Sequence, residues 1–193
     1  RGLGDVYKRQ VSLPVLNNQT GINRGFDTFQ LMDSHNDMAA MLDEMENQQK
    51  CLDSKGLGGN TPQFFLLNVG ETHYPYALPD EEKNDLPHIS GVNGIFRKLD
   101  GQIDEAGNLV SDKEAGDFMD MAKIEECRQR QINTVRYLDS EVFPRLYDMM
   151  PKDTWIVVTA DHGELFGEAG YFGHGPIMHE KVFEVPFLEG KLK

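Results

Sequence analysis

Hydrophobic residues in this chain follow two patterns, continuous apolar runs and helically spaced positions. Continuous runs occupy residues 64–69 and 154–160, and such runs are typical of strands that a sheet buries on both faces. Helical spacing begins after Ser34, which has the character of an N-cap, and it appears again from about Glu114. The spaced positions are Met38, Met41, Leu42 and Met45 in the first segment and Met121, Ile124, Ile132, Val135, Leu138 and Val142 in the second. The pattern predicts two amphipathic helices, of which the first ends near Lys50.

Two prolines divide the second helical segment. Pro144 should kink the helix or start a new helical turn, and Pro151 should close it. Two shorter strands are expected, one at the end of residues 20–30 and one at residues 182–188. The resulting order of strands and helices predicts an α/β sheet with its ligand site at the carboxyl ends of the strands.

Two stretches lack periodicity and are predicted as loops. Residues 55–61 are glycine-rich, and residues 77–112 carry Pro, Gly, Asp and Asn with little pattern. We expect the second stretch to be a long surface excursion with a small hairpin. Loops of this length in compact domains are often lids or substrate walls.

The composition excludes several classes of partner. The 193 residues have a formal net charge of -13, and phosphate neutralisation needs Lys and Arg, so a nucleic-acid partner is not expected. No apolar run approaches 18 residues, so no membrane segment is visible in the chain. An anionic substrate would need local positive charge from a metal ion or a histidine. Cys51 and Cys127 form neither a disulfide framework nor a zinc pattern.

Residues 1–10 differ in character from the rest of the chain. Arg-Gly-Leu-Gly-Asp-Val-Tyr-Lys-Arg-Gln resembles the in-frame translation of a transposon-based sequencing adapter, which we interpret as an artefact. Without these residues Lys+Arg falls from 19 to 16 and Asp+Glu from 32 to 31, so the net charge moves from -13 to -15. The natural chain is then expected to start near Val11, with its N-terminal part missing.

Asp161 and His162 are the first candidates for chemistry. They follow the apolar run 154–160, and a metal-assisted hydrolase needs a hard oxygen and a neutral imidazole at fixed positions. Both side chains can reach one ion if the backbone turns sharply, which Gly163 permits. In the alternative, Asp161 caps a turn and His162 packs against it. The apolar strand before the pair and the Gly-His-Gly sequence after it favour the metal site.

His174 and His73 are the next candidates. His174 lies between two glycines and could bind the anionic group of a substrate or protonate a leaving oxygen. His73 follows the run 64–69, and parallel strands open on one sheet edge, so His73 and Asp161 could face one cleft. The alternative for each is a loop histidine satisfied by local hydrogen bonds. His35 and His88 are interpreted as surface residues and His179 as structural.

Several short motifs occur in an order that resembles the sulfatases of the alkaline-phosphatase-like superfamily. They are Gly-Phe-Asp at residues 25–27, Asn-Val-Gly-Glu-Thr-His-Tyr-Pro-Tyr at 68–76, Tyr-Leu-Asp at 137–139, Thr-Ala-Asp-His-Gly-Glu at 159–164, Gly-His-Gly at 173–175 and Val-Pro-Phe at 185–187. Each motif alone is weak evidence for the family, but their order over most of residues 20–190 makes the resemblance strong.

The resemblance implies a fold, a reaction and a set of site residues. The fold is a mostly parallel sheet flanked by helices on both faces, here incomplete at the N-terminus, and the reaction is hydrolysis of sulfate or phosphate esters through a covalent intermediate. Asp161 and His162 correspond to metal ligands, His73 to a histidine that contacts the sulfuryl group, and His174 to a position where many sulfatases carry a lysine. The implied cofactor is one divalent metal, Ca²⁺ in the first place, with Mn²⁺, Mg²⁺ or Zn²⁺ as alternatives. The implied partner is a small-molecule or carbohydrate ester.

The chain also departs from the family. Sulfatases carry a Cys or Ser in a Cys/Ser-x-Pro-x-Arg motif, which is oxidised to formylglycine, and an early Asp-Asp pair that binds metal. Neither occurs here; Ser-Leu-Pro-Val-Leu at residues 12–16 lacks the arginine. We therefore expect the formylglycine nucleophile in a missing N-terminal part. Residues 11–193 would then be the C-terminal part of one sulfatase-like catalytic domain and inactive alone.

Two other readings stay open. The same site could cleave phosphomonoesters, phosphodiesters or phosphonates, because many sulfatases have Asn where this chain has His162, and His is seen in relatives that cleave phosphorus esters. A chain naturally without a nucleophile would instead be a non-catalytic binding protein that kept the fold. The organic part of the substrate, the oligomeric state and the compartment do not follow from the sequence.

Overall fold

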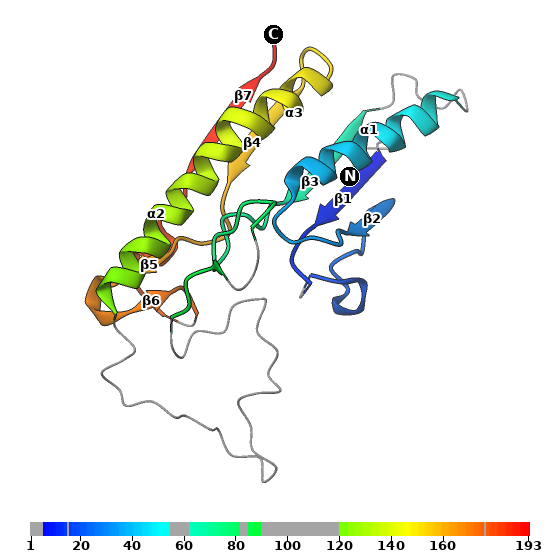
Figure 1. Ribbon diagram of the computed structural model, residues 1–193. Helices are drawn as coiled ribbons and strands as arrows, with labels where there is room; N and C mark the ends of the chain where they lie inside the picture. Colours follow the sequence, from blue (N-terminus) through cyan, green and yellow to red (C-terminus); the bar gives the residue numbers. More distant parts are fainter. Residues whose placement is uncertain (1–5, 15, 55–61, 82–84, 90–119, 176) are drawn as a thin grey trace. The chain divides into compact units, whose positions relative to one another are not determined.

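The computed structural model shows an α/β protein (Figure 1). It describes residues 6–14, 16–54, 62–81, 85–89, 120–175 and 177–193. The chain divides into two compact units, the first made of Arg1–Asp80 and Asn133–Met150 and the second of Glu81–Ile132 and Pro151–Lys193. The parallel sheet of the first unit and its helices confirm the predicted fold class. The predicted loop 55–61 lies outside the described residues, as does most of the predicted excursion 77–112.

The first unit contains a sheet of three parallel strands in the order β2-β1-β3. The strands are β1 (Val6–Val11), β2 (Thr28–Leu31) and β3 (Gln63–Asn68), and a 3₁₀ turn at Asn18–Thr20 precedes β2. The short strand expected near the end of residues 20–30 is thus β2, and the apolar run 64–69 is mostly β3. In β3, however, Phe64 and Leu66 are 48% and 36% exposed, so the expected burial on both faces is wrong.

Residues 6–10, whose adapter origin stays a prediction, form most of the central strand. Lys8 in β1 is only 4% exposed, and its Nζ has no hydrogen-bond partner among the described residues. The amine lies 5.0 Å from the centre of the Phe65 ring, and burial lowers its pKa. Gln10 is also buried and donates from Nε2 to the Met41 carbonyl oxygen at 3.3 Å. Two polar side chains therefore occupy interior positions of the sheet.

Helix α1 (Met38–Ser54) follows the predicted apolar spacing and ends four residues beyond Lys50. Its N-terminus is capped by Asp37, whose Oδ1 accepts from the Ala40 N–H at 2.9 Å. A second carboxylate, that of Glu71, accepts from the Met38 N–H at 2.6 Å. The prediction of Ser34 as the N-cap is wrong, because the Ser34 hydroxyl instead contacts the Asn36 side chain.

The second helical segment consists of three pieces. Helix α2 (Met121–Tyr137) begins after Asp120, whose Oδ1 accepts from the N–H groups of Ala122 and Lys123, and residues 114–119 lie outside the described part. A π-helical turn (Leu138–Val142) leads into α3 (Phe143–Met149). Pro144 lies in the first turn of α3, where the missing N–H costs nothing, so the predicted restart is confirmed.

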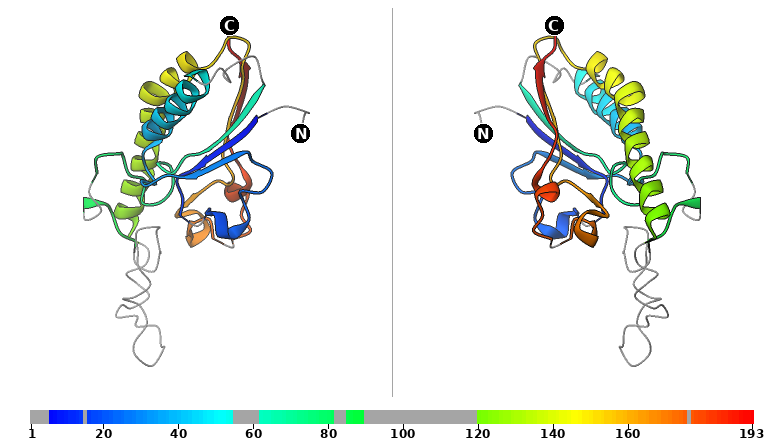
Figure 2. Two further views of the ribbon diagram at one scale, coloured as in Figure 1. Left: turned by 90° about the vertical axis from the view of Figure 1, so that its right-hand side faces the viewer. Right: turned by 90° about the vertical axis from the view of Figure 1, so that its left-hand side faces the viewer.

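The core of the first unit lies between its helices and its sheet. In Figures 1 and 2, α1 runs along one side of the strands. The buried cluster comprises Met38, Met41, Leu42, Met45, Leu138, Val142 and Leu146, and Phe65 and Leu67 of β3 pack against it. Arg145 joins α3 to α1 through Asp43 at 2.6 Å and Glu46 at 2.9 Å.

His35 is 9% exposed, so its prediction as a surface residue is wrong.

The second unit contains two antiparallel strand pairs. Strand β4 (Trp155–Thr159) confirms the position of the predicted strand and pairs with β7 (Phe187–Lys191), as Figure 2 shows. Trp155 and Val157 are 67% and 54% exposed, so the expected burial of this strand on both faces is wrong. Strands β5 (Leu165–Phe166) and β6 (Phe172–Gly173) form a hairpin around a 3₁₀ turn at Glu168–Gly170.

The segment between the hairpin and β7 differs from the expectation. The predicted strand 182–188 is wrong for its first half, because helix α4 (Glu180–Phe183) comes before β7. His179 caps this helix by accepting from the Lys181 N–H at 3.1 Å, which agrees with its structural interpretation. No helix of the described residues is long and apolar enough to cross a bilayer.

Candidate functional site

Asp161 and His162 leave the end of β4, as predicted. The Asp161 side chain is 80% exposed and that of His162 30%, and their Oδ1 and Nε2 atoms lie 3.7 Å apart. The Nδ1 atom of His162 lies 2.8 Å from the Gly163 carbonyl oxygen. This contact assigns the proton of a neutral imidazole to Nδ1 and leaves the lone pair on Nε2, the atom nearer to Asp161. One oxygen and one nitrogen donor are thus close enough to bind the same cation.

Gly163 is required for a different reason from the one expected. Its φ is not in the left-handed region, so the turn itself does not demand glycine. A Cβ on Gly163 would instead overlap the Lys181 carbonyl oxygen, and the Gly163 N–H donates to the Val182 carbonyl at 2.8 Å. Helix α4 therefore packs directly against the backbone that carries His162.

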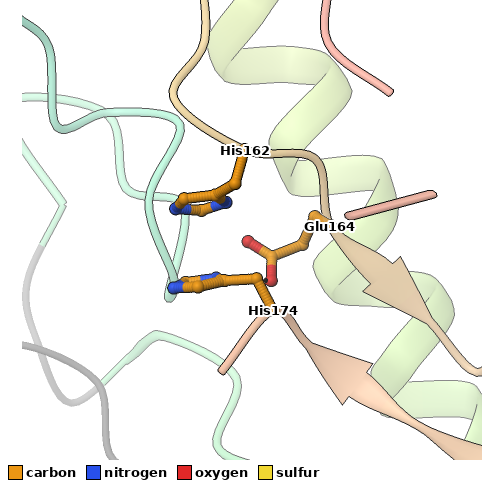
Figure 3. Close-up of side chains that lie close together, drawn as sticks. All are labelled: His162, Glu164 and His174. Atoms are coloured by element: carbon orange, nitrogen blue, oxygen red, sulfur yellow. Dashed lines mark hydrogen bonds and ion pairs between the residues drawn. The ribbon is translucent and has the colours of Figure 1, made fainter. Parts of the chain in front are cut away.

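The β5–β6 hairpin brings Glu164 and His174 together. Leu165 pairs with Gly173, so the residues just outside the hairpin, Glu164 and His174, lie opposite one another. Glu164 Oε1 is 3.0 Å from His174 Nδ1, and the Glu164 side chain is 7% exposed. Figure 3 shows the carboxylate beside the two imidazole rings. This contact pairs a largely buried carboxylate with an imidazole that is 33% exposed.

His174 also stacks on His162. The ring centroids are 3.6 Å apart and the planes meet at 24° (Figure 3). Gly173 has a φ of 88°, a conformation that favours glycine, and it turns the backbone between β6 and His174. Two of the predicted site residues are therefore in direct contact.

The charge of His174 responds to these neighbours. Its pKa is raised above the ordinary histidine value, first by the hydrogen bond that His174 Nδ1–H donates to Glu164, while burial acts in the opposite direction. Asp161 adds a smaller contribution in the raising direction. The imidazolium form is therefore more favoured for His174 than for an isolated histidine.

His162, Glu164 and His174 also offer donor atoms that all lie within 4.8 Å of one another, a group that could hold a metal ion. Two imidazole nitrogens and a carboxylate would suit a transition metal. The stacked rings are less suitable, because lone pairs in nearly parallel planes do not converge on one point. Glu164 was not predicted; the available signal was its spacing from His174 about the glycine-rich turn at residues 167–170.

His73 lies in the first unit, on the loop that follows β3. Its Nδ1 is 2.9 Å from the Tyr74 carbonyl oxygen. Among the described strands, β3 belongs to the three-stranded sheet of the first unit and β4 pairs with β7 in the second unit. A shared role for these residues therefore stays a prediction.

The loop around His73 is closely packed. A Cβ on Gly70 would overlap the His35 carbonyl oxygen, and Tyr74, Tyr76 and Ala77 are buried. Glu71 is completely buried, and burial raises its pKa. The backbone that carries His73 is thus held on both sides by buried residues.

Comparison with known protein families gives one finding. The family model described as Sulfatase matches residues 4–188. Neither a curated protein nor a solved structure gave a significant match to the chain.

Proposed function

The chain belongs to the sulfatase family, and from this premise we propose that it acts in metal-dependent hydrolysis of sulfate esters. Asp161 and His162 would hold the divalent cation, and His73 and His174 would bind the sulfuryl oxygens or assist the leaving group. The observation that supports this most is the 3.7 Å separation of Asp161 Oδ1 and His162 Nε2 at the end of β4.

The residues present fit a cation at this position. A metal-binding histidine usually donates its other ring N–H to a carbonyl or carboxylate, and His162 has the Gly163 carbonyl 2.8 Å from Nδ1. Asp161 adds a hard oxygen donor that is open to solvent. Family resemblance favours Ca²⁺, and the imidazole donor would also accept Mn²⁺ or Zn²⁺. A bound cation would stabilise the charge that develops on the transferred group.

His174 would meet the anionic part of the ester. The chain has a net charge of -13, which repels anions, so binding needs a local cation. The Glu164 carboxylate raises the pKa of His174 and so favours the form in which both ring nitrogens donate hydrogen bonds. A donor of this kind suits a sulfuryl oxygen or a leaving oxygen that gains charge.

The attacking nucleophile has no candidate among these residues. No Cys/Ser-x-Pro-x-Arg sequence occurs in the 193 residues. The proposal therefore assigns the nucleophile, expected as formylglycine, to residues outside this sequence, and it assigns binding and charge stabilisation to the residues described above.

Metal binding can be tested on the chain itself. We expect calorimetric titration with Mn²⁺ to show one site in the wild type and none in Asp161→Ala. Glu189→Ala, which removes an exposed carboxylate from β7 in the same unit, serves as the control and should bind as the wild type does. Unchanged Mn²⁺ binding in Asp161→Ala would refute the assignment of the metal ligands.

A second candidate reaction is the cleavage of phosphate esters or phosphonates. His162 favours it, because many sulfatases carry Asn at that position and an imidazole ligand suits Mn²⁺ or Zn²⁺. Turnover of an aryl sulfate and of the matching aryl phosphate by the intact enzyme would separate the two reactions. Faster turnover of the phosphate would overturn the sulfatase proposal and leave the metal site in place.

A further inference from the structure

The hairpin β5–β6 determines which side chain lies beside His174. The antiparallel register pairs Leu165 with Gly173 and Phe166 with Phe172, and one step further along both strands are Glu164 and His174. The 3₁₀ turn at Glu168–Gly170 sets this register, since the Gly167 N–H donates to the Tyr171 carbonyl at 2.9 Å. The meeting of Glu164 with His174 is therefore built into the hairpin.

The contact itself is short and shielded from water. Glu164 Oε1 lies 3.0 Å from His174 Nδ1, and the Glu164 side chain is 7% exposed against 33% for that of His174. A carboxylate in a site of low dielectric needs a donor, and the Nδ1–H of His174 supplies one. The His174 side chain as a whole keeps partial access to solvent.

Two contacts within the second unit limit the orientation of the ring. Glu164 holds the Nδ1 edge, and the His162 ring covers one face at a centroid distance of 3.6 Å. A hydrogen bond at one edge together with a stacked neighbour restricts rotation about the bond that joins the ring to the chain. Under the proposed function, the ring would meet a substrate through its Nε2 edge.

We propose that Glu164 is a positioning residue, which holds His174 in the Nδ1–H form and fixes its ring beside His162. Its consequence for catalysis rests on the proposed function, because the Nε2 edge matters only if His174 meets the ester. The positioning itself does not depend on the reaction. It differs from metal binding by His162, Glu164 and His174 together, in which Nδ1 or Oε1 would face an ion instead of one another.

The test is the tautomer of His174, measured in the full chain by long-range ¹H–¹⁵N spectra of the imidazoles at a pH where the ring is neutral. We expect Nδ1 of His174 to carry the proton in the wild type. Glu164→Met, which keeps the volume of the buried side chain and removes the acceptor, should shift the proton toward Nε2. Glu164→Gln should restore the wild-type pattern, because the amide oxygen still accepts from Nδ1–H.

Two control variants make the result decisive. His174→Asn assigns the resonances, and Glu189→Met repeats the same chemical change at an exposed position of β7, where the spectrum should not change. An unchanged tautomer in folded Glu164→Met would overturn the inference. If Glu164→Met fails to fold, the wild-type spectrum still decides, because a proton on Nε2 would overturn the inference directly.

Metal titration separates this inference from its alternatives. Zn²⁺ binding that is lost in Glu164→Gln and His174→Asn but kept in Asp161→Ala would assign the three residues to a metal site and overturn the positioning role. Loss of Mn²⁺ binding in Asp161→Ala, with binding kept in Glu164→Gln and His174→Asn, would support both proposals. Unchanged Mn²⁺ binding in Asp161→Ala would refute the proposed metal ligands and leave the tautomer result standing. In the intact enzyme we expect Glu164→Met to lower kcat about 10- to 100-fold with a smaller change in KM, and Glu164→Gln to recover part of the loss.

Discussion

In the loops that follow β3 and β4, a glycine lets the backbone pack closely against a carbonyl oxygen, but the surroundings of the two loops differ. Gly70 and Gly163 each lie where a Cβ would overlap a backbone carbonyl oxygen, that of His35 in the first loop and of Lys181 in the second. After β3, buried residues surround the loop, whereas the Asp161 side chain after β4 is 80% exposed. A chain that must present side chains to a ligand can therefore fix the backbone by close contact and leave the side chains accessible.

The strongest way to break this comparison is to add one methyl group to either glycine. We expect Gly70→Ala and Gly163→Ala each to lower the free energy of unfolding by about 3 kcal/mol, because a backbone carbonyl cannot move aside as a side chain can. Urea unfolding followed by circular dichroism measures the change. Gly175→Ala is the matched control within the second loop region, since nothing lies within 4 Å of its Cβ position; we expect a change within about 0.5 kcal/mol. Equal effects at Gly163 and Gly175 would contradict the packing role of Gly163.

The next prediction concerns the buried carboxylate that holds the first loop. Burial raises the pKa of Glu71 above its ordinary value of 4.5, although the hydrogen bond from Met38 N–H acts against the shift. A raised folded-state pKa stabilises the fold fully below the unfolded value, and this stabilisation is lost as the pH rises through the folded value. Glu71→Gln cannot titrate, so the stability of the wild type should fall relative to this variant as the pH rises above 4.5.

Chemical unfolding of the wild type and Glu71→Gln from pH 4 to pH 8 checks this expectation. The difference between the two curves removes the contribution of all other titrating groups. A difference that does not change with pH would show that Glu71 titrates in the folded protein as it does in the unfolded chain. Glu71→Ala should in addition lower the free energy of unfolding by about 2 kcal/mol, because the Met38 N–H loses its acceptor.

The smallest expected effect is a gain in stability at the centre of the first sheet. Lys8 is 4% exposed, and its Nζ has no hydrogen-bond partner among the described residues. Lys8→Met keeps the length of the side chain and removes the buried amine, so the free energy of unfolding should rise by about 1 kcal/mol. A loss of stability would mean that the contact of the amine with the Phe65 ring outweighs its desolvation.

Much of the local structure could be predicted because its causes are local. Helical spacing of Met38, Met41, Leu42 and Met45 corresponds to the buried face of α1, and the apolar run before Asp161 corresponds to β4. The structure of segment 182–188 was harder to predict, because its apolar residues suit a strand as well as they suit a helix. A histidine cap and the packing of α4 on Gly163 make its first half helical, and pairing with β4 moves the strand to residues 187–191.

In the candidate site, too, some features could be predicted from the sequence and others depend on tertiary contacts. Asp161 and His162 are neighbours in the sequence, so their closeness follows from the chain itself, and the motifs around them were enough to indicate the sulfatase family. The pairing of Glu164 with His174 depends on the register of the β5–β6 hairpin. The stacking of His174 on His162 depends on the direction in which the chain leaves β6. The expected meeting of His73 with Asp161 relied on one shared sheet, which the described strands do not form.

By itself, the sequence determined the positions of most helices and strands, the acidic character of the chain and the candidate residues for a cation site. Those properties depend on side chains a few positions apart, whose relation is set by the period of a helix or a strand. The tertiary structure alone decided that Gly163 is needed for contact with α4, that Glu71 is buried at the start of α1, and that Glu164 contacts His174. Each of these depends on groups ten or more positions apart in the chain, whose distance is set by strand register and packing and not by the period of one helix or strand.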